Sequence, residues 1–245
     1  MKPLSAADIV RIWELGIAQS PMDRALTILS PAFPELTREE LSRLSLGQLN
    51  AHLFDVRERL LGPEMSCYAE CPHCTQGLEF MIAVSDIRGA GSVEPKQQEQ
   101  ELSIEGYELR FRLLNSLDLK TVAEAPDKKE MRRMLAARCV LEAHREGTEI
   151  SGDQLPEIVI TSLAARLSEC DSNAEVLLDL ECPSCKNRWQ TALDIAGFFW
   201  NELSAQVRRL LGEVHTIASA YGWHEAEILA MSARRRHYYL ELISA

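Results

Sequence analysis

The N-terminal third of the chain has the apolar periodicity of α-helices. Intervals of three and four residues place one apolar stripe on a long helix, and this stripe consists of Leu46, Leu49, Leu53, Val56 and Leu60. Gly62 and Pro63 end that helix. Two helices precede it, over about residues 5–19 and 21–30, and Ser5 is a suitable cap for the first. This region is therefore predicted to be helical.

Apolar residues alternate with other side chains in two regions, each beside a pair of cysteines. The strand after the first pair is predicted from Leu78, Phe80, Ile82 and Val84. Strands on either side of the second pair are expected over residues 176–180 and 189–193. Between these two regions, residues 102–113 predict a β-hairpin with a turn near Gly106, and residues 88–100 predict a solvated loop.

Helical periodicity returns over residues 118–144 and 156–167, and then over one long helix from about residue 195 to Gly222. The apolar face of the long helix consists of Phe199, Leu203, Val207, Leu210, Val214, Ile217 and Tyr221. Two short helices follow it. Because helices and strands do not alternate as β-α-β units, a parallel sheet is not expected. The predicted fold class is α+β, mostly helical, with a small antiparallel sheet built around the cysteines.

These patterns divide the chain into three segments. Residues 1–63 form an N-terminal helical region, and residues 195–245 form a C-terminal one. Residues 64–194 are predicted as a β unit, resembling a zinc ribbon, with helices inserted at about 117–168. Any bond between the two cysteine pairs would tie the first third of the protein to the last third.

The charge balance limits the possible partners. The chain has 37 acidic and 26 basic residues, a formal net charge of −11 at pH 7, and Arg234, Arg235 and Arg236 form its one conspicuous basic cluster. A general nucleic-acid binder needs a basic surface, so that class is disfavoured. No apolar run reaches the roughly 20 residues of a membrane span, and the first residues lack the apolar core of a signal peptide. We therefore expect a cytoplasmic protein whose thiols stay reduced.

Two CPxC steps carry the strongest chemical signal in the sequence. Cys71 and Cys74 form the first, Cys182 and Cys185 form the second, and each step follows a glutamate. Two such steps supply the four thiolates of a tetrahedral Zn²⁺ site, and four thiolates leave no position open for a substrate. The sequence therefore predicts a structural zinc site at these four cysteines, between two matching strand–CPxC–strand units.

Several alternatives stay open at this point. An iron ion could take the same ligands, and Cys67, four residues before Cys71, could replace one of them. Cys139 and Cys170 are expected to be buried apolar residues. A thioredoxin-like redox pair would require the start of a helix in a β-α-β unit, a context that neither pair has. A zinc-ribbon adaptor for nucleic acid or transcription is the second interpretation, and a thiol redox protein is the third.

No motif in the sequence predicts catalysis. Nucleophile elbows, phosphate loops and HExxH helices do not occur, so we expect neither an enzyme nor a small-molecule substrate. The C-terminal end is instead rich in aromatic residues beside the arginine cluster. Since aromatic residues and arginine concentrate in protein interfaces, this end is the best candidate for a docking surface.

Several stretches together resemble a known protein family. They comprise residues 181–185, Trp189, 193–195, 199–203, 210–215, 221–225, 228–229 and 235–240, with the first cysteine pair and the leucine-rich helix upstream. The chain resembles base-plate-associated proteins encoded with contractile phage tails and phage-tail-like injection systems. This resemblance implies a non-enzymatic part of the tail, or a factor that helps to assemble it, with other base-plate or tail components as partners. Whether the protein stays in the finished particle is left open.

Overall fold

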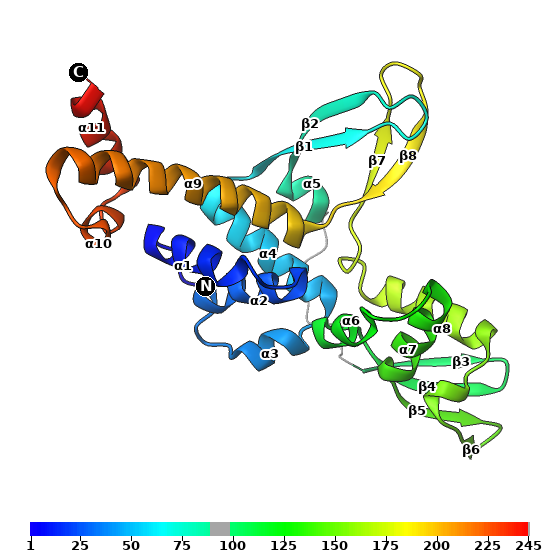
Figure 1. The fold of residues 1–245 in the computed structure, drawn as a ribbon. Helices are drawn as coiled ribbons and strands as arrows, with labels where there is room; N and C mark the ends of the chain where they lie inside the picture. The colour runs from blue at the N-terminus through cyan, green and yellow to red at the C-terminus, as the bar shows by residue number, and fades with distance from the viewer. Residues whose placement is uncertain (89–98, 245) are drawn as a thin grey trace.

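Helices from the two ends of the chain share one hydrophobic core in the computed structural model, which describes residues 1–88 and 99–244 (Figure 1). The helices of this part are α1 (Ala6–Gly16), α2 (Pro21–Ala32), α3 (Arg38–Arg43), α4 (Leu46–Leu61), α9 (Ile195–Tyr221), α10 (Glu225–Leu229) and α11 (Ala233–Ser244). The predicted stripe of α9 is buried from Phe199 to Ile217, whereas Tyr221 at its end is exposed. Gly222, with φ of 69°, closes α9 in a left-handed conformation that favours glycine.

Two β-hairpins leave this helical core and meet at their tips (Figure 1). The first consists of β1 (Glu64–Glu70) and β2 (Gly77–Ala83) and is followed by the short helix α5 (Val84–Arg88), which takes Val84 out of the predicted strand. The second consists of β7 (Leu177–Glu181) and β8 (Arg188–Ala192). Each hairpin is a separate two-stranded antiparallel sheet, and each turn contains one cysteine pair.

A second, smaller core is formed by the segment between the two hairpins. Its elements are β3 (Glu99–Ile104), β4 (Tyr107–Arg112), α6 (Ser116–Val122), α7 (Lys128–Cys139), β5 (Val140–Arg145), β6 (Thr148–Glu149), the 3₁₀ helix η1 (Gly152–Gln154) and α8 (Glu157–Cys170). The four strands pair antiparallel in the order β3-β4-β5-β6, and their apolar residues pack against α7 and α8. The α+β class is confirmed, and the described residues form three small antiparallel sheets instead of one.

The prediction of helix over residues 118–144 was wrong at its end, and residues 123–127 interrupt the helix between α6 and α7. Helix α7 stops at Cys139, and the next six residues form β5, which pairs with β4. Along β5 the side chain of Ala143 is buried between Glu142, which is exposed, and His144, which is half-buried, and a turn at Glu146 and Gly147 leads into β6. Pairing with β4 therefore overrides the local helical pattern. Of the predicted loop 88–100, residues 89–98 lie outside the described part, and Glu99 already belongs to β3.

Polar contacts join the smaller core to the helical core near the start of α4. Asp171, after the end of α8, accepts a hydrogen bond from the Gly47 N–H at 3.0 Å. The Asn50 side chain donates to the carbonyls of Asn173 and Ala174 at 2.9 and 3.2 Å. These bonds fix the chain just before β7 begins, so they hold the base of the second hairpin against the helical core.

Candidate metal centre

The two cysteine-bearing turns have the same backbone geometry. The Cys71 N–H donates to the Gln76 carbonyl, and the Thr75 N–H donates to the Cys71 carbonyl, at 3.0 and 2.9 Å. In the second turn, Cys182 makes the same bonds with Asn187 and Lys186 at 2.9 and 3.0 Å. Thr75 and Lys186 both have positive φ, 59° and 61°. Each CPxC step thus forms a tight turn that directs two sulfurs to the same side.

The structure brings the four predicted ligands together. All four sulfur atoms lie within 4.8 Å of one another, although the two pairs are more than a hundred residues apart in sequence. Between the turns, Cys71 Sγ lies 3.7 Å from Cys185 Sγ, and Cys74 Sγ lies 3.6 Å from Cys182 Sγ. Four sulfurs bonded to zinc at about 2.3 Å stand roughly 3.8 Å apart in a regular tetrahedron. The donor set and these spacings fit a metal ion held by four thiolates.

Backbone hydrogen bonds favour one thiolate in each cysteine pair, at Cys71 and at Cys182. Burial raises the pKa of Cys71, but the N–H groups of Cys74 and His73, which point at its sulfur, lower it to about 6. The Cys185 N–H likewise lowers the pKa of Cys182. The Gln76 N–H lowers the pKa of Cys74, but the neighbouring sulfurs and burial together raise it to about 12. The negative charge of the first thiolates opposes ionisation of the remaining thiols in the cluster. A bound divalent cation would offset that charge.

The other cysteines of the described residues lie outside this cluster. Cys67 faces the helical core from β1, where burial raises its pKa, and its sulfur is not among the four that converge. Cys139 is completely buried at the end of α7, and burial raises its pKa to about 12. Cys170 is buried at the end of α8. The expectation that Cys139 and Cys170 are buried is confirmed, and neither CPxC step lies at the start of a helix.

A buried ion pair supports the base of the first hairpin. Arg57 of α4 is 2% exposed and makes a bidentate bond to Glu202 of α9, with N–O distances of 2.9 and 2.7 Å. It also donates to the carbonyls of Gly62 and Glu64, at 2.6 and 2.7 Å. One guanidinium therefore connects α4, α9 and the first residue of β1, which the apolar pattern of the sequence did not indicate.

Comparison with known families then shows which proteins this chain is related to. The sequence model described as "T4 bacteriophage base plate protein" matches residues 25–200, which is more than half of the chain. The chain belongs to this family. The base plate family match includes α4, both hairpins and all four clustered cysteines, and it ends near the start of α9. The predicted relationship to base-plate-associated phage tail proteins is thereby confirmed.

No curated protein and no solved structure matches the chain. Across residues 1–88 and 99–244, no helix combines the length and apolar character needed to cross a bilayer.

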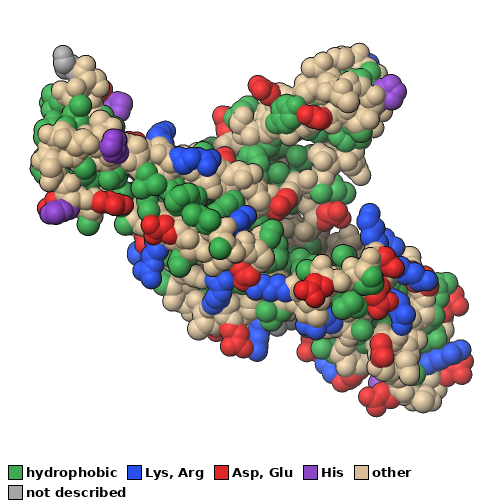
Figure 2. Space-filling model, in the orientation of Figure 1, with side chains coloured by type: hydrophobic (Ala, Val, Ile, Leu, Met, Phe, Trp, Pro, Cys, Tyr) green, Lys and Arg blue, Asp and Glu red, His purple; other side chains and the backbone are tan. Residues whose placement is uncertain are grey.

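The predicted docking surface at the C-terminal end has a packed aromatic centre and an exposed apolar edge. Trp223 stacks on Tyr221 with ring centroids 4.7 Å apart, and Tyr239 contacts Trp223 edge-on at 4.9 Å. We call the exposed side chains beside these rings the C-terminal patch, which consists of Arg234, Arg235, Tyr238, Leu242 and Ile243. Figure 2 shows hydrophobic side chains on the end of the molecule formed by α10 and α11.

One arginine of the predicted basic cluster is not part of this surface. Arg236 is 4% exposed and donates to Glu213 of α9 at 2.8 Å and to the Met231 carbonyl at 2.6 Å. It therefore anchors α11 to α9, and only Arg234 and Arg235 remain available to a partner.

Proposed function

We propose that this protein is a zinc-stabilised, non-enzymatic component of the base plate of a contractile phage tail or phage-tail-like injection system. The family match over residues 25–200 carries this proposal, because it assigns the chain to base plate proteins and includes both hairpins. In this role the protein acts by contact with other tail components and needs no reaction centre. We propose Zn²⁺ as the metal and Cys71, Cys74, Cys182 and Cys185 as its ligands.

The chemistry of the donor set supports zinc. Soft thiolate ligands in a tetrahedral S₄ arrangement select zinc or iron–sulfur chemistry over magnesium, calcium or manganese. A Zn²⁺ ion with four thiolates has no free coordination position, so it would supply stability and no catalysis. The ion would fix the tips of the two hairpins to each other, while the helices at their bases hold the other ends.

The contacts of the proposed role involve the helical body. The regions 1–63 and 195–245 share one core, and we propose that they act together as a single body that presents the C-terminal patch to a neighbouring tail protein. Its exposed residues Tyr238 and Leu242 stand four apart on α11, on one side of the helix. Aromatic and arginine side chains beside exposed aliphatic ones are the composition of an interface centre.

Metal analysis of the purified protein tests the zinc assignment. We expect about one zinc per chain by mass spectrometry of the metal content, and loss of that zinc in the Cys71→Ser/Cys182→Ser variant. The Cys139→Ser/Cys170→Ser variant is the matched control, because both of its cysteines lie outside the cluster. Iron in place of zinc, or equal metal in the two variants, would refute the assignment.

Assembly in the host system tests the structural role. Deletion of the gene should stop base plate formation, and the wild-type protein supplied from a plasmid should restore it. Mass spectrometry of mature particles then separates a resident component from an assembly factor that leaves. Normal base plates without the gene would contradict the proposed function, whatever metal the protein binds.

A further inference from the structure

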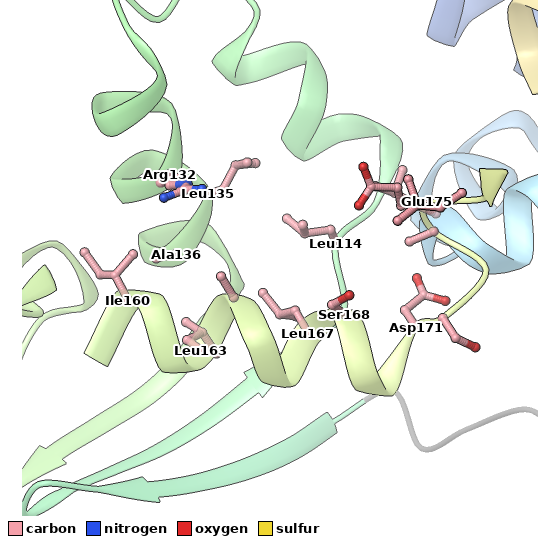
Figure 3. A pocket seen from close by; sticks show the side chains of 15 residues that line it. Leu114, Arg132, Leu135, Ala136, Ile160, Leu163, Leu167, Ser168, Asp171 and Glu175 are labelled. Carbon is pink, nitrogen blue, oxygen red and sulfur yellow. The ribbon is translucent and has the colours of Figure 1, made fainter. Parts of the chain in front are cut away.

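A groove on the smaller core has the dimensions and lining of a site for one helix. It has a volume of about 320 Å³ and lies between α7, α8 and the residues that lead into β7 (Figure 3). Helix α8 contributes Ile160, Leu163, Ala164, Leu167 and Ser168, and Asp171 follows just after its end. The α8 residues recur at the three- and four-residue spacing of one helix face, over roughly 12 Å at 1.5 Å per residue.

The floor of this groove is apolar and stable, and its upper wall is accessible. Ile160 and Leu163 are buried and belong to the smaller core, so the floor is formed whether or not a partner is bound. Ala164 is exposed beside them, and Leu167 is half-buried. From α7, Leu135 and Ala136 complete the opposite side. A third helix between α7 and α8 would therefore cover apolar side chains that now face solvent.

The two ends of the groove have opposite charge. Arg132 lies at the end near Ile160, and Glu175 lies at the other end beside Asp171 (Figure 3). Lys128 and Lys129 precede Arg132 by four and three residues, so they extend the basic end along the same face of α7. No ion pair joins Lys128, Lys129 or Arg132 to a carboxylate within the described part of the chain. These are unusual features in a protein with a net charge of −11.

From this arrangement we infer that the groove binds an amphipathic helix of another protein, with acidic residues in its first turn and basic residues in its last. Apolar side chains at three- and four-residue spacing would fill the groove, as in other helix-in-groove complexes. Acidic residues are favoured at a helix N-terminus and basic ones at its C-terminus. The first turn would thus lie at Lys128 and Arg132, and the helix would run parallel to α8. The identity of the partner as a tail component rests on the proposed function. The binding of an amphipathic helix in the groove does not depend on that function.

Two synthetic peptides test the charge-directed recognition on the full-length protein. The first is an 18-residue helix with a leucine stripe, glutamates in the first turn and lysines in the last; the second has the same composition with these charges exchanged. Fluorescence anisotropy should give saturable binding of the first peptide and affinity at least about tenfold weaker for the second. Equal binding of the two peptides, or no binding of the first, would overturn the inference.

Two pairs of variants locate the binding. Ala164 lines the groove, whereas its neighbour Ala165 is exposed outside it, so Ala164→Glu should weaken the first peptide about tenfold and Ala165→Glu should not. Arg132→Glu should weaken it similarly and improve binding of the second peptide, whereas Arg208→Glu, at an exposed arginine of α9, should change neither. Circular dichroism checks that each variant is folded. Equal effects within either pair would contradict the assigned position.

Photo-cross-linking identifies the natural occupant. A benzophenone side chain is placed at position 164 or at position 165 of the full chain, which is produced together with the other tail proteins. A cross-link from position 164 alone to an acidic-start amphipathic helix of another protein supports the inference. A cross-link to a second copy of this chain, to the chain itself or to a segment of different composition refutes it. Loss of base plate assembly in the absence of the gene is read separately, so the two proposals fail independently.

Discussion

Zinc should stabilise this protein by an amount that depends on how far apart the two cysteine pairs are in the sequence. Cys74 and Cys182, which face each other at 3.6 Å, are 108 residues apart. An unfolded chain could assemble the same four thiolates only by closing that loop, which costs about 4.7 kcal/mol for a loop of roughly 100 residues. The folded protein has already brought the sulfurs together, so it should bind the ion more tightly by about that amount.

Because of this difference in affinity, the stabilisation should rise with the free zinc concentration and then reach a plateau. Stabilisation rises by about 1.4 kcal/mol for each tenfold increase in free zinc above the dissociation constant. It levels off near 5 kcal/mol, when the unfolded chain also binds the ion. For a chain of this size, each kcal/mol changes the melting temperature by roughly 2–4 °C, so the full effect is about 10–20 °C.

Thermal unfolding followed by circular dichroism, at free zinc concentrations set by a chelating buffer, measures the curve. The Cys71→Ser/Cys182→Ser variant should show no zinc-dependent increment, and Cys139→Ser/Cys170→Ser should show the full one even if its absolute melting temperature is lower. The comparison uses increments because Cys139 is completely buried and its replacement alters packing. An unchanged melting temperature after verified removal of the metal would refute the reasoning.

Three further predictions concern other parts of the structure. Arg57→Ala should lower the free energy of unfolding by about 3–5 kcal/mol in urea titrations, because it leaves a partly buried carboxylate and two carbonyls without their hydrogen-bond donor. Arg59→Ala, at an exposed residue of the same helix, should change the free energy of unfolding by less than about 0.5 kcal/mol. Similar losses in the two variants would contradict the role of the ion pair. Burial raises the pKa of Asp118, but its bonds to two arginines outweigh this effect and lower the pKa below the ordinary 3.8. The contribution of Asp118 to stability is therefore present above pH 4 and lost as the pH falls through the lowered pKa. Asp118→Asn should accordingly reduce the loss of unfolding free energy at acidic pH. Leu242→Ala should weaken base plate assembly with an unchanged melting temperature, and the equally exposed Leu15→Ala on α1 should not; equal effects would remove the C-terminal patch from the interface.

The parts of the fold that sequence predicted well are those where local pattern and tertiary packing agree. The stripe of α9 faces the core because its spacing matches the helix period, and the strands beside the cysteines alternate as expected. The four cysteines could be named as a set because each CPxC step carries its own turn geometry. The convergence of the two steps depends on contacts such as Asp171 with Gly47, which link residues 124 apart and leave no local signal.

The sequence-based predictions failed where tertiary contacts decide between two local structures. Residues 140–145 follow a helix without a glycine or proline to end it, and pairing with β4 alone makes them a strand. Arg236 looked like one of three equal arginines, but Glu213 on another helix selects it for burial. The basic end of α7 could have been found from the four Lys and Arg between residues 128 and 133. The groove beside it needed the arrangement of two helices in space.

The shared core of the two chain ends also sets an order of events during synthesis. Helices α1, α2 and α4 leave the ribosome early, but the face they bury against belongs to α9, which starts at Ile195. At roughly 5–20 residues per second, more than a hundred residues must follow α4 first, a delay on the order of ten seconds. During that time the cluster has only the two cysteines of the first hairpin, and the residues of the smaller core are synthesised before α9. The helical core therefore cannot be completed before α9 is synthesised, and the four cysteines cannot converge before Cys185 is added.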